Sequence, residues 1–345
     1  MTRCTRPRSR PLRCLLPIRR PNGRRPSVSD IRVSTSRGWE IVHLGSDELD
    51  VDVVPGKGGD VTSVRWRPLG VDVMWHTRWG LRVRGESVTA GSSETLLMHA
   101  YPGGWQTVFP NGGDAAVEHG VEWGMHGEAW LAAYDWRADG PGAVELSTQL
   151  VRSPFSVVKR ITVTGPTVTV AETATNEAAE PIEVMWSQHP AFGAPLIGPG
   201  ARVETSARTV HRDPSAHAAW PALPGAGPDD GADLSRLPEP RSGVSRLAYL
   251  GDFAEGRAGI VNDELGLRAD LTWDASLMPY AWYWLEAGGR TGFPFYSDAY
   301  VLALEPATSW PGRGIATVRR TTGTQITIDP GQSRTSSVSL TLAVP

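Results

Sequence analysis

Three side chains in this sequence occupy positions from which they could exchange protons with a bound molecule. Glu305 ends the apolar run YVLAL and precedes Pro306, which favours extended backbone and closes a strand there. Carboxylates are rarely buried unless they are paired or used, and burial at the end of so apolar a strand raises the pKa of a carboxyl group. Glu305 is therefore the candidate general base. The alternative is a strand-end glutamate that points into water.

Two histidines are candidates for the matching acid. His189 follows the run IEVMWSQ and precedes Pro190, so it too is expected at a strand end in extended geometry. His126 lies in a turn before Gly127, where a glycine permits the close approach of a ligand. For His189 the alternative is a core histidine bonded to backbone. Each positioned acid or base contributes about 10²–10⁴-fold to a rate, so these groups need no metal or organic cofactor, and we predict none.

The stretch Tyr101–Trp136 has the composition of a concave polar site. It contains two glycine pairs, a Phe-Pro-Asn step and four tryptophans around the turn at His126. Flat aromatic faces suit the C–H faces of a sugar, and glycines let backbone approach a ligand. Asn and Asp in turns usually hydrogen-bond the backbone, so a structural role is the alternative for Asn111 and Asp114. The candidate ligand-binding residues are Trp105, Gln106, Asn111 and Asp114, with Trp282 and Trp284 as weaker candidates.

Other classes of site are poorly represented. Glu128 lies two residues after His126, but there is no His-x-His pair, and His99 and His119 lie at irregular spacing. This pattern argues against a cupin-like metal site, and Glu128 is interpreted as a residue at the rim of the site or behind it. The sequence also lacks a Gly-x-Ser-x-Gly elbow, a phosphate loop and a dinucleotide fingerprint.

Charge is distributed unevenly along the 345 residues. The formal net charge is −3, but residues 1–30 hold nine Arg and one acidic residue, which leaves 25 basic and 36 acidic residues elsewhere. We therefore expect an acidic body that does not bind nucleic acid and that disfavours a strongly anionic substrate. Both cysteines, Cys4 and Cys14, lie in the basic segment, so no disulfide or thiolate metal site is expected in the folded part.

Residues 1–30 are interpreted as a disordered basic leader, with binding to nucleic acid or anionic lipid as the alternative. The apolar stretch Leu12–Ile18 is too short for a secretory signal and is interrupted by Arg13 and Pro17. No run approaches the ~20 apolar residues of a membrane-spanning helix. We predict a cytoplasmic protein with no membrane partner, folded as a single domain over residues 31–345.

From Trp39 onward, short alternating apolar runs follow one another between turn signals, which indicates an all-β chain with little helix. Roughly seventeen strands without a 40–50-residue repeat favour a large antiparallel β-sandwich over a propeller. Residues 211–245 break the pattern and are predicted as a long loop. The strands are expected at 40–44, 48–54, 60–66, 71–75, 143–151, 156–164, 167–176, 181–188, 246–250, 258–261, 267–273, 281–286, 299–305, 315–320, 324–328 and 336–343.

Three segments, in this order, resemble the aldose 1-epimerase (galactose-mutarotase-like) family. They are GGWQTVFPNGGDA followed by HGEAW, SQHPAFGAPLI at Ser187–Ile197, and LALEPAT at Leu302–Thr308. The resemblance implies the twisted β-supersandwich of that family, with Glu305 as base and His189, assisted by His126, as acid. It also implies Asp252 as a ligand of sugar hydroxyls. Many members carry an arginine before the first glycine pair, where this chain has Tyr101-Pro102, and Arg82 is a candidate replacement.

The activity implied by the resemblance is interconversion of the α and β anomers of a free sugar by acid/base ring opening. The partner is then a small sugar, and the protein a monomer or homodimer. One alternative keeps the fold but acts on a glycoside or an oxidised sugar as a lyase, isomerase or hydrolase. A hydrolase would ordinarily show two working carboxylates, and only Glu305 is strongly placed. The other alternative is a carbohydrate-binding protein without catalysis.

Overall fold

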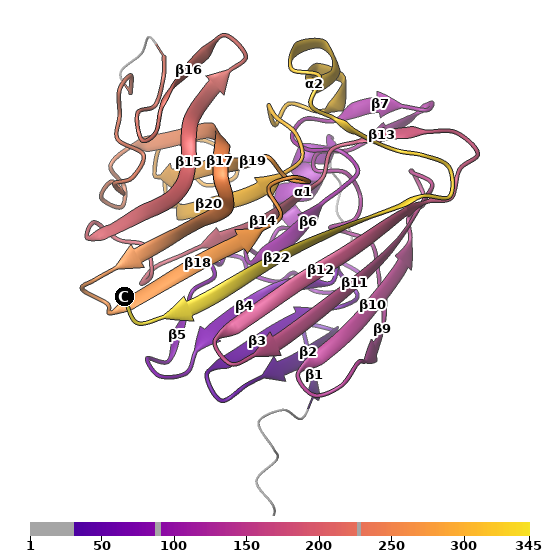
Figure 1. Cartoon of the computed structure of the whole chain (residues 1–345). Helices are drawn as coiled ribbons and strands as arrows, with labels where there is room; N and C mark the ends of the chain where they lie inside the picture. Colours follow the sequence, from indigo (N-terminus) through magenta and orange to yellow (C-terminus); the bar gives the residue numbers. More distant parts are fainter. Residues whose placement is uncertain (1–30, 87–90, 226–228) are drawn as a thin grey trace, which may run out of the picture.

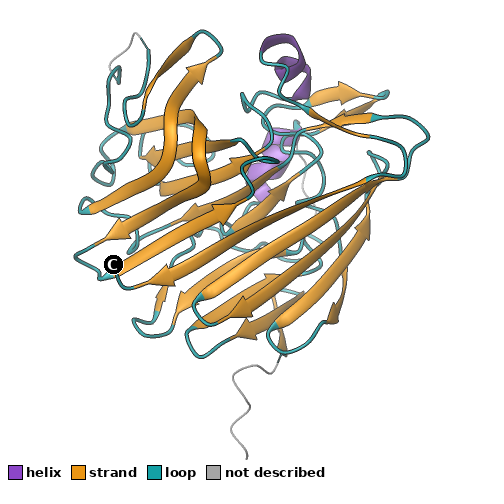
Figure 2. Cartoon of the chain, in the orientation of Figure 1, coloured by secondary structure: helices purple, strands orange, loops and turns teal. Residues whose placement is uncertain are grey.

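Antiparallel strands make up most of the part of the chain that the structure describes, and helix there is confined to two short segments (Figures 1 and 2). The computed structural model describes residues 31–86, 91–225 and 229–345, so the predicted basic leader lies outside the described residues. Eighteen strands pair into one continuous sheet, and four short strands form two separate ribbons. The prediction of an all-β antiparallel fold is confirmed.

The sheet folds over into two layers. In Figure 1 the front layer runs from β9 to β18, and the indigo and purple strands β2, β3 and β4 lie behind it. The pairing order of the front layer is β9 (Asp135–Ala138), β10 (Ala143–Gln149), β11 (Phe155–Thr164), β12 (Thr167–Asn176), β22 (Ser333–Ala343) and β18 (Leu267–Trp273). The back layer pairs β1 (Arg32–Ser36), β2 (Trp39–Gly45), β3 (Leu49–Val54), β4 (Asp60–Trp66), β6 (Trp105–Val108), β14 (Ser187–Phe192), β20 (Tyr300–Ala307) and β19 (Tyr280–Ala287), with β5 (Val71–Asp72) beside β4.

Two long bent strands, β15 (Ala201–Asp213) and β17 (Val244–Asn262), join the layers. The first part of β17 pairs with β19 and its last part pairs with β18, so one strand passes from the back layer to the front layer. The predicted strands 246–250 and 258–261 are therefore two parts of a single strand. Asp252 lies in the bend with φ of 53°, a left-handed geometry that Asp tolerates better than most residues.

The main core lies between the layers and is built by alternation along the strands. In β12 every second residue is buried, and in β11 the buried positions alternate over Phe155–Val163, so one face of each strand is buried. Val51 and Val53 of β3 belong to the same buried cluster as Val144 and Leu146 of β10. Contacts between strands far apart in the sequence thus hold the sandwich together.

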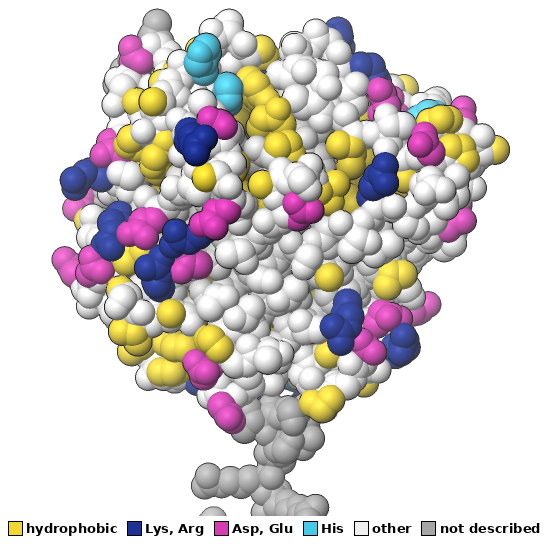
Figure 3. All heavy atoms as spheres, viewed as in Figure 1, with side chains coloured by type: hydrophobic (Ala, Val, Ile, Leu, Met, Phe, Trp, Pro, Cys, Tyr) yellow, Lys and Arg dark blue, Asp and Glu magenta, His cyan; other side chains and the backbone are white. Residues whose placement is uncertain are grey.

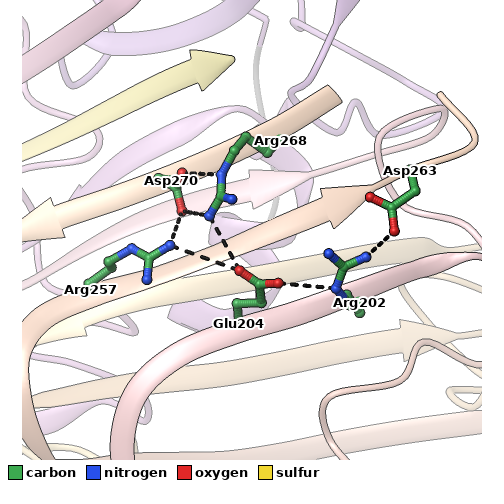
Figure 4. Close-up of polar contacts among 6 residues, drawn as sticks. All are labelled: Arg202, Glu204, Arg257, Asp263, Arg268 and Asp270. Carbon is green, nitrogen blue, oxygen red and sulfur yellow. Dashed lines mark hydrogen bonds and ion pairs between the residues drawn. The ribbon is translucent and has the colours of Figure 1, made fainter. Parts of the chain in front are cut away.

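The middle of the outer face of the front layer, over β12 and β22, is neutral and polar. Hydroxyl side chains pair across β12 and β22, as in Thr167 with Thr341 (2.9 Å) and Thr169 with Ser339 (2.8 Å). Figure 3 shows a broad white area over these strands, with opposite charges side by side on its left over β15, β17 and β18. The charged group is an ion network that bridges three strands, drawn in Figure 4 and made of Arg202, Glu204, Arg257, Asp263, Arg268 and Asp270. Its side chains are partly exposed, so the network lies on the surface.

The strands β14 and β20, like the short strand β6, are covered on both faces. Leu302 and Leu304 of β20 point into the main core, whereas Val301 and Ala303 join a second apolar cluster. That second cluster includes Leu97 from helix α1 (Ser93–Ala100). Glu305 has the same parity as Val301 and Ala303, so it lies on the face that α1 covers.

Several short elements depart from the sequence predictions. The run 315–320 was expected to be a strand because of its β-branched residues, but it forms helix α2 (Ile315–Thr321). The long loop predicted at 211–245 contains the end of β15, the short strand β16 (Ala216–Ala219) and the start of β17. The expected strand 181–188 is split in two, and its first part pairs with β21. The ribbons are β7 (Ala116–Glu118) with β8 (Val121–Trp123), and β13 (Ile182–Val184) with β21 (Ile326–Ile328).

Within the described ranges no helix is long and apolar enough to cross a membrane. The same ranges contain no group of three or more His, Cys, Asp or Glu side chains placed to hold a metal ion.

Candidate active site

Four neighbouring strands of the back layer place four of the predicted residues in one row. His189 of β14 is opposite Gln106 of β6, and Glu305 of β20 is opposite Trp282 of β19. The register of β14 with β20, Ser187 with Ala307 and Ala191 with Ala303, brings His189 opposite Glu305. Residues opposite one another in antiparallel strands project from the same face. The register alone therefore brings Gln106, His189, Glu305 and Trp282 together.

Glu305 and His189 are in contact at the centre of this row. Nε2 of His189 lies 3.5 Å from Oε1 of Glu305, and the side chains are 11% and 2% exposed, respectively. The second oxygen, Oε2 of Glu305, is buried without a hydrogen-bond partner in the described structure. An unpartnered buried oxygen is costly unless a ligand or water completes its hydrogen bonds. The carboxylate is thus free to accept a proton from a bound molecule.

His126 is held beside this pair by its own backbone and by a neighbouring turn. The N–H of Gly113 donates to its Nδ1 (3.1 Å), while its own N–H donates to the carbonyl of Gly113 (3.1 Å). Because Nδ1 accepts a hydrogen bond, the ring proton of the neutral imidazole lies on Nε2. The ring centroid lies 5.8 Å from that of His189. His126 can therefore present a fixed N–H donor to a ligand.

Burial changes the proton affinity of all three groups. It raises the pKa of Glu305 well above the usual carboxyl range, since the charged form loses its water. It lowers the pKa of His189 to about 4. For His126, burial and the nearby His189 lower the pKa to about 3. Once ionised, Glu305 is a strong base, and the imidazolium of His189 is a strong acid, whereas His126 stays neutral.

The row forms part of a hollow whose walls are mostly apolar and aromatic. The empty space at the hollow, including the open solvent at its mouth, is about 820 Å³. Glu305 is the only carboxylate among the described residues that line it. The lining residues are Leu97, Met98, Tyr101, Gln106, Val108, Gly113, Met125, His126, Trp130, His189, Leu247, Trp282, Trp284, Arg290, Glu305 and Gly312.

A buried ion pair fixes the polar end of the row. The Gln106 amide donates from Nε2 to the carbonyl of Gly103 (2.6 Å) and to Oδ2 of Asp60 (3.3 Å). Asp60 in turn pairs with Lys57, and both side chains are almost fully buried. Since both donated hydrogen bonds go to the protein, Oε1 of Gln106 is left to accept one from a ligand. Lys57 also lies 5.4 Å from the ring centroid of Trp130, another lining residue.

Five predicted ligand-binding residues lie outside the hollow. The Asn111 side chain is fully buried and bonds backbone: it donates to Asp114 O (2.9 Å) and Gly124 O (3.0 Å) and accepts from Ile315 N (2.8 Å). Trp105 donates its indole N–H to buried Gln188 (2.7 Å). Asp114 is exposed, Asp252 lies in the bend of β17, and Arg82 pairs with Glu86 beside a different hollow.

The glycine pairs also have a structural explanation. A Cβ on Gly103 would collide with the backbone of Trp75, and one on Gly113 would collide with the backbone of Gly312. These glycines therefore allow backbone to pack on backbone rather than on a ligand. Glu128 has a similar structural role, because its carboxylate accepts from the N–H groups of Arg152 (3.0 Å) and Ser153 (2.9 Å).

Sequence reasoning missed several lining residues. Tyr101 packs its ring 5.8 Å from that of His189, and its buried hydroxyl has no partner in the described structure. It occupies the place before the glycine pair where an arginine was expected, and that position was the available signal. Leu97 and Met98 belong to helix α1, whose N-cap is Ser92. Arg290 lies in the irregular segment GGRTG, which carried no pattern that singled it out.

The comparisons with known proteins agree with the fold. A family model described as "Domain of unknown function (DUF4432)" matches residues 36–342. No curated protein matches the chain. The protein Slr1438 from Synechocystis sp. PCC 6803 is similar in structure, with a TM-score of 0.66 and 16% identity over 88% of this chain and 96% of that one.

Two further solved structures carry informative names. A protein from Escherichia coli K12, provisionally assigned as an aldose 1-epimerase, has a TM-score of 0.63 and 19% identity, covering 88% of this chain and 99% of its own. A galactose mutarotase-like protein from Clostridium acetobutylicum has a TM-score of 0.65 and 13% identity, covering 91% and 98%. At these identities the likeness establishes the fold, which is that of the galactose mutarotase-like proteins.

Proposed function

This chain belongs to the DUF4432 family, and from its fold and its site together we propose that it is a sugar 1-epimerase, which interconverts the anomers of a free aldose. The observation that carries the proposal is the contact of His189 with Glu305 in the hollow, 3.5 Å between Nε2 and Oε1. A base and an acid on one face are what ring opening requires.

The reaction needs two proton transfers and no external reagent. Ionised Glu305 takes the proton from the anomeric hydroxyl, and the electron pair of that O–H bond forms the carbonyl at C1. The bond from C1 to the ring oxygen breaks, and the ring oxygen takes a proton from the imidazolium of His189. A half-turn about the C1–C2 bond then presents the other face of the carbonyl, and the same steps in reverse close the ring to the other anomer.

His126 acts in this scheme as a hydrogen-bond donor rather than as the acid. Its pKa of about 3 keeps it neutral, and its Nδ1 is already bonded to Gly113. The remaining Nε2–H can donate to the ring oxygen or a neighbouring hydroxyl and thereby stabilise charge that develops there. His189 is therefore assigned as the group that delivers the proton.

Gln106 and Trp282 position the sugar. Oε1 of Gln106 accepts from a sugar hydroxyl, since its Nε2 is already bonded to Gly103 and Asp60. Trp282 lies next to Glu305 across the strand pair and offers a flat apolar face to the C–H side of the ring. Its indole N–H is bonded to Ser309 O (2.7 Å), which fixes the ring in place.

The lining of the hollow favours this reaction over glycoside hydrolysis. Hydrolysis ordinarily requires two carboxyl groups flanking the scissile bond. Asp60, a buried carboxylate next to the row, lies behind Gln106 and is paired with Lys57. Only one working carboxylate therefore faces the space that a sugar would occupy.

Proton exchange NMR on a panel of free aldoses tests the proposal. The protein should accelerate α/β interconversion of at least one sugar above the uncatalysed rate in the same buffer. Tryptophan fluorescence of the same mixtures reports binding independently, because Trp130, Trp282 and Trp284 line the hollow. Binding without any acceleration would reject the epimerase proposal in favour of a non-catalytic carbohydrate-binding protein.

A further inference from the structure

The hollow carries one permanent positive charge, and its setting points to the chemistry of the ligand. Among the described lining residues, Arg290 is the only Arg or Lys. Its side chain is exposed, so it lies where the hollow opens to solvent. The one carboxylate among the described lining residues, Glu305, contacts His189 and forms no ion pair with Arg290.

Arg290 makes no ion pair within the described ranges, although many other arginines do. Arg202, Arg268 and Arg319, for example, each contact two carboxylates. The nearest acidic group in the sequence, Glu286, does not neutralise it. That carboxylate accepts from the hydroxyl of Ser245 (2.7 Å) and from the backbone N–H of Arg290 (3.3 Å), so it holds the main chain of Arg290 instead.

The main chain around Arg290 is anchored on both sides. Besides the bond to Glu286, its carbonyl accepts from the N–H of Ser297 (2.9 Å). The guanidinium lies 6.0 Å from the ring centroid of Phe295. Phe295 is buried and packs against Trp75 and Trp284, with centroids 5.9 and 5.8 Å apart. The cation thus lies beside an aromatic ring that packs against Trp284 of the lining, and it has no carboxylate partner among the described residues.

We propose that the sugar carries an oxyanion, a carboxylate, phosphate or sulfonate, at the end remote from its anomeric carbon, and that Arg290 binds this group. The inference rests on the proposed function, which places the anomeric carbon at Glu305 and His189. A guanidinium presents parallel N–H donors that match two oxygens of such a group, and this pairing is stronger than a neutral hydrogen bond.

The acidic character of the whole chain does not oppose this assignment. At physiological ionic strength, salt largely screens the interaction between surface charges that lie more than about 8 Å apart. The attraction between Arg290 and an oxyanion in contact with it acts over a much shorter distance and is screened less. The expectation that the substrate is not strongly anionic rested on the summed charge of the chain. The charge that a ligand meets at this end of the hollow is that of Arg290.

The test compares one hexose with its 6-phosphate, its 6-sulfonate and its uronate by exchange NMR. Wild-type protein should show kcat/KM for at least one charged sugar that is roughly 10- to 100-fold above that for the neutral hexose. Arg290→Gln should bring this ratio close to one, mainly through KM, and Arg290→Lys should retain part of it. Arg320→Gln removes the same charge from the exposed surface of α2 and should leave the ratio unchanged.

Binding, followed by tryptophan fluorescence, separates the two proposals. If charged sugars bind, Arg290→Gln weakens that binding and no sugar is turned over, the assignment of Arg290 stands and the epimerase proposal falls. If neutral and charged sugars are turned over equally and Arg290→Gln has no effect on the ratio, the epimerase proposal stands and the oxyanion site is rejected. Failure of every charged sugar to bind also rejects the oxyanion site.

Discussion

His189 and Glu305 face each other across β14 and β20, and each is followed by a proline. Pro190 and Pro306 lack an N–H, and paired positions between the two strands are found on either side of them, at Ser187 with Ala307 and at Ala191 with Ala303. The two side chains therefore meet where the ladder between their strands is interrupted. Both strands are buried on both faces, which desolvates the pair and changes its proton affinity in the direction that acid/base chemistry needs.

The pH dependence of kcat/KM should be bell-shaped. Turnover needs Glu305 ionised and His189 protonated, so the pair must hold one proton. Activity should fall as pH drops below about 4, where both groups are protonated, and fall again as pH rises through the raised pKa of Glu305, where the pair loses its proton. Steady exchange rates measured from pH 3.5 to 9 check this. A rate independent of pH over that span would contradict the assignment of the pair.

Replacing Glu305 by Gln should make the protein more stable at neutral pH. The folded-state pKa of Glu305 is raised, so the folded state binds this proton more tightly than the unfolded chain. Wild-type stability is therefore lost as pH rises from about 4.5 through the raised pKa, and the uncharged variant avoids that loss. Chemical unfolding of both proteins at several pH values measures the difference. If the stability advantage of Glu305→Gln over wild type shrank as pH rose, the pKa of Glu305 would not be raised in the folded state.

Tyr101→Phe should shift stability and activity in opposite directions. Its hydroxyl is buried with no partner in the described structure, so its removal should leave the free energy of unfolding unchanged or raise it by about 1 kcal/mol. Tyr101 lines the hollow with its ring centroid 5.8 Å from that of His189, and we expect kcat/KM to fall roughly 10-fold through a lost hydrogen bond from its hydroxyl to the sugar. Thermal unfolding and exchange NMR on one preparation check both signs. A marked loss of stability would mean that the hydroxyl is bonded in the folded protein.

Asn111→Ala should damage the fold rather than the affinity for the sugar. The amide bonds the backbone of two neighbouring turns and accepts from the first N–H of α2, so its removal leaves several buried groups without partners. We expect a loss of about 3 kcal/mol in the free energy of unfolding, with KM unchanged in the folded fraction. A raised KM with an unchanged free energy of unfolding would instead mean that Asn111 binds the sugar.

The sequence predicted the parts of the fold that depend on alternation along a strand. The strands 60–66, 167–176 and 267–273 were placed with their observed ends, because period-two burial is a local signal. The prediction of a strand at 315–320 was wrong. The β-branched residues of this run favour a strand, but in the folded chain the side chain of Asn111, from a distant loop, accepts a hydrogen bond from Ile315 N at the start of α2. That bond connects residues 204 positions apart, which no local pattern reveals.

The site was predictable in its central row and at the turn of His126. Glu305, His189 and Gln106 lie at strand positions where the type of residue and its neighbours indicate chemistry. Arg290 lies in an irregular segment, and it reaches the hollow because Glu286 and Ser297 hold its backbone. Asp252 was suggested by resemblance, but it lies in the bend of β17 and not among the residues that line the hollow. Loop geometry and strand bending depend on tertiary contacts, and for that reason these residues were misplaced or missed.

The central claim is that Glu305 is the base for anomer interconversion, and one comparison tests it most directly. Exchange NMR on the sugar that wild-type protein turns over fastest should be repeated with Glu305→Gln and with Glu255→Gln, a matched change at an exposed position of β17. Loss of a general base predicts that Glu305→Gln lowers kcat by about 10²–10⁴-fold with binding retained, while Glu255→Gln behaves as wild type. A Glu305→Gln protein that is folded, binds the sugar and keeps more than a tenth of the wild-type rate would contradict the claim.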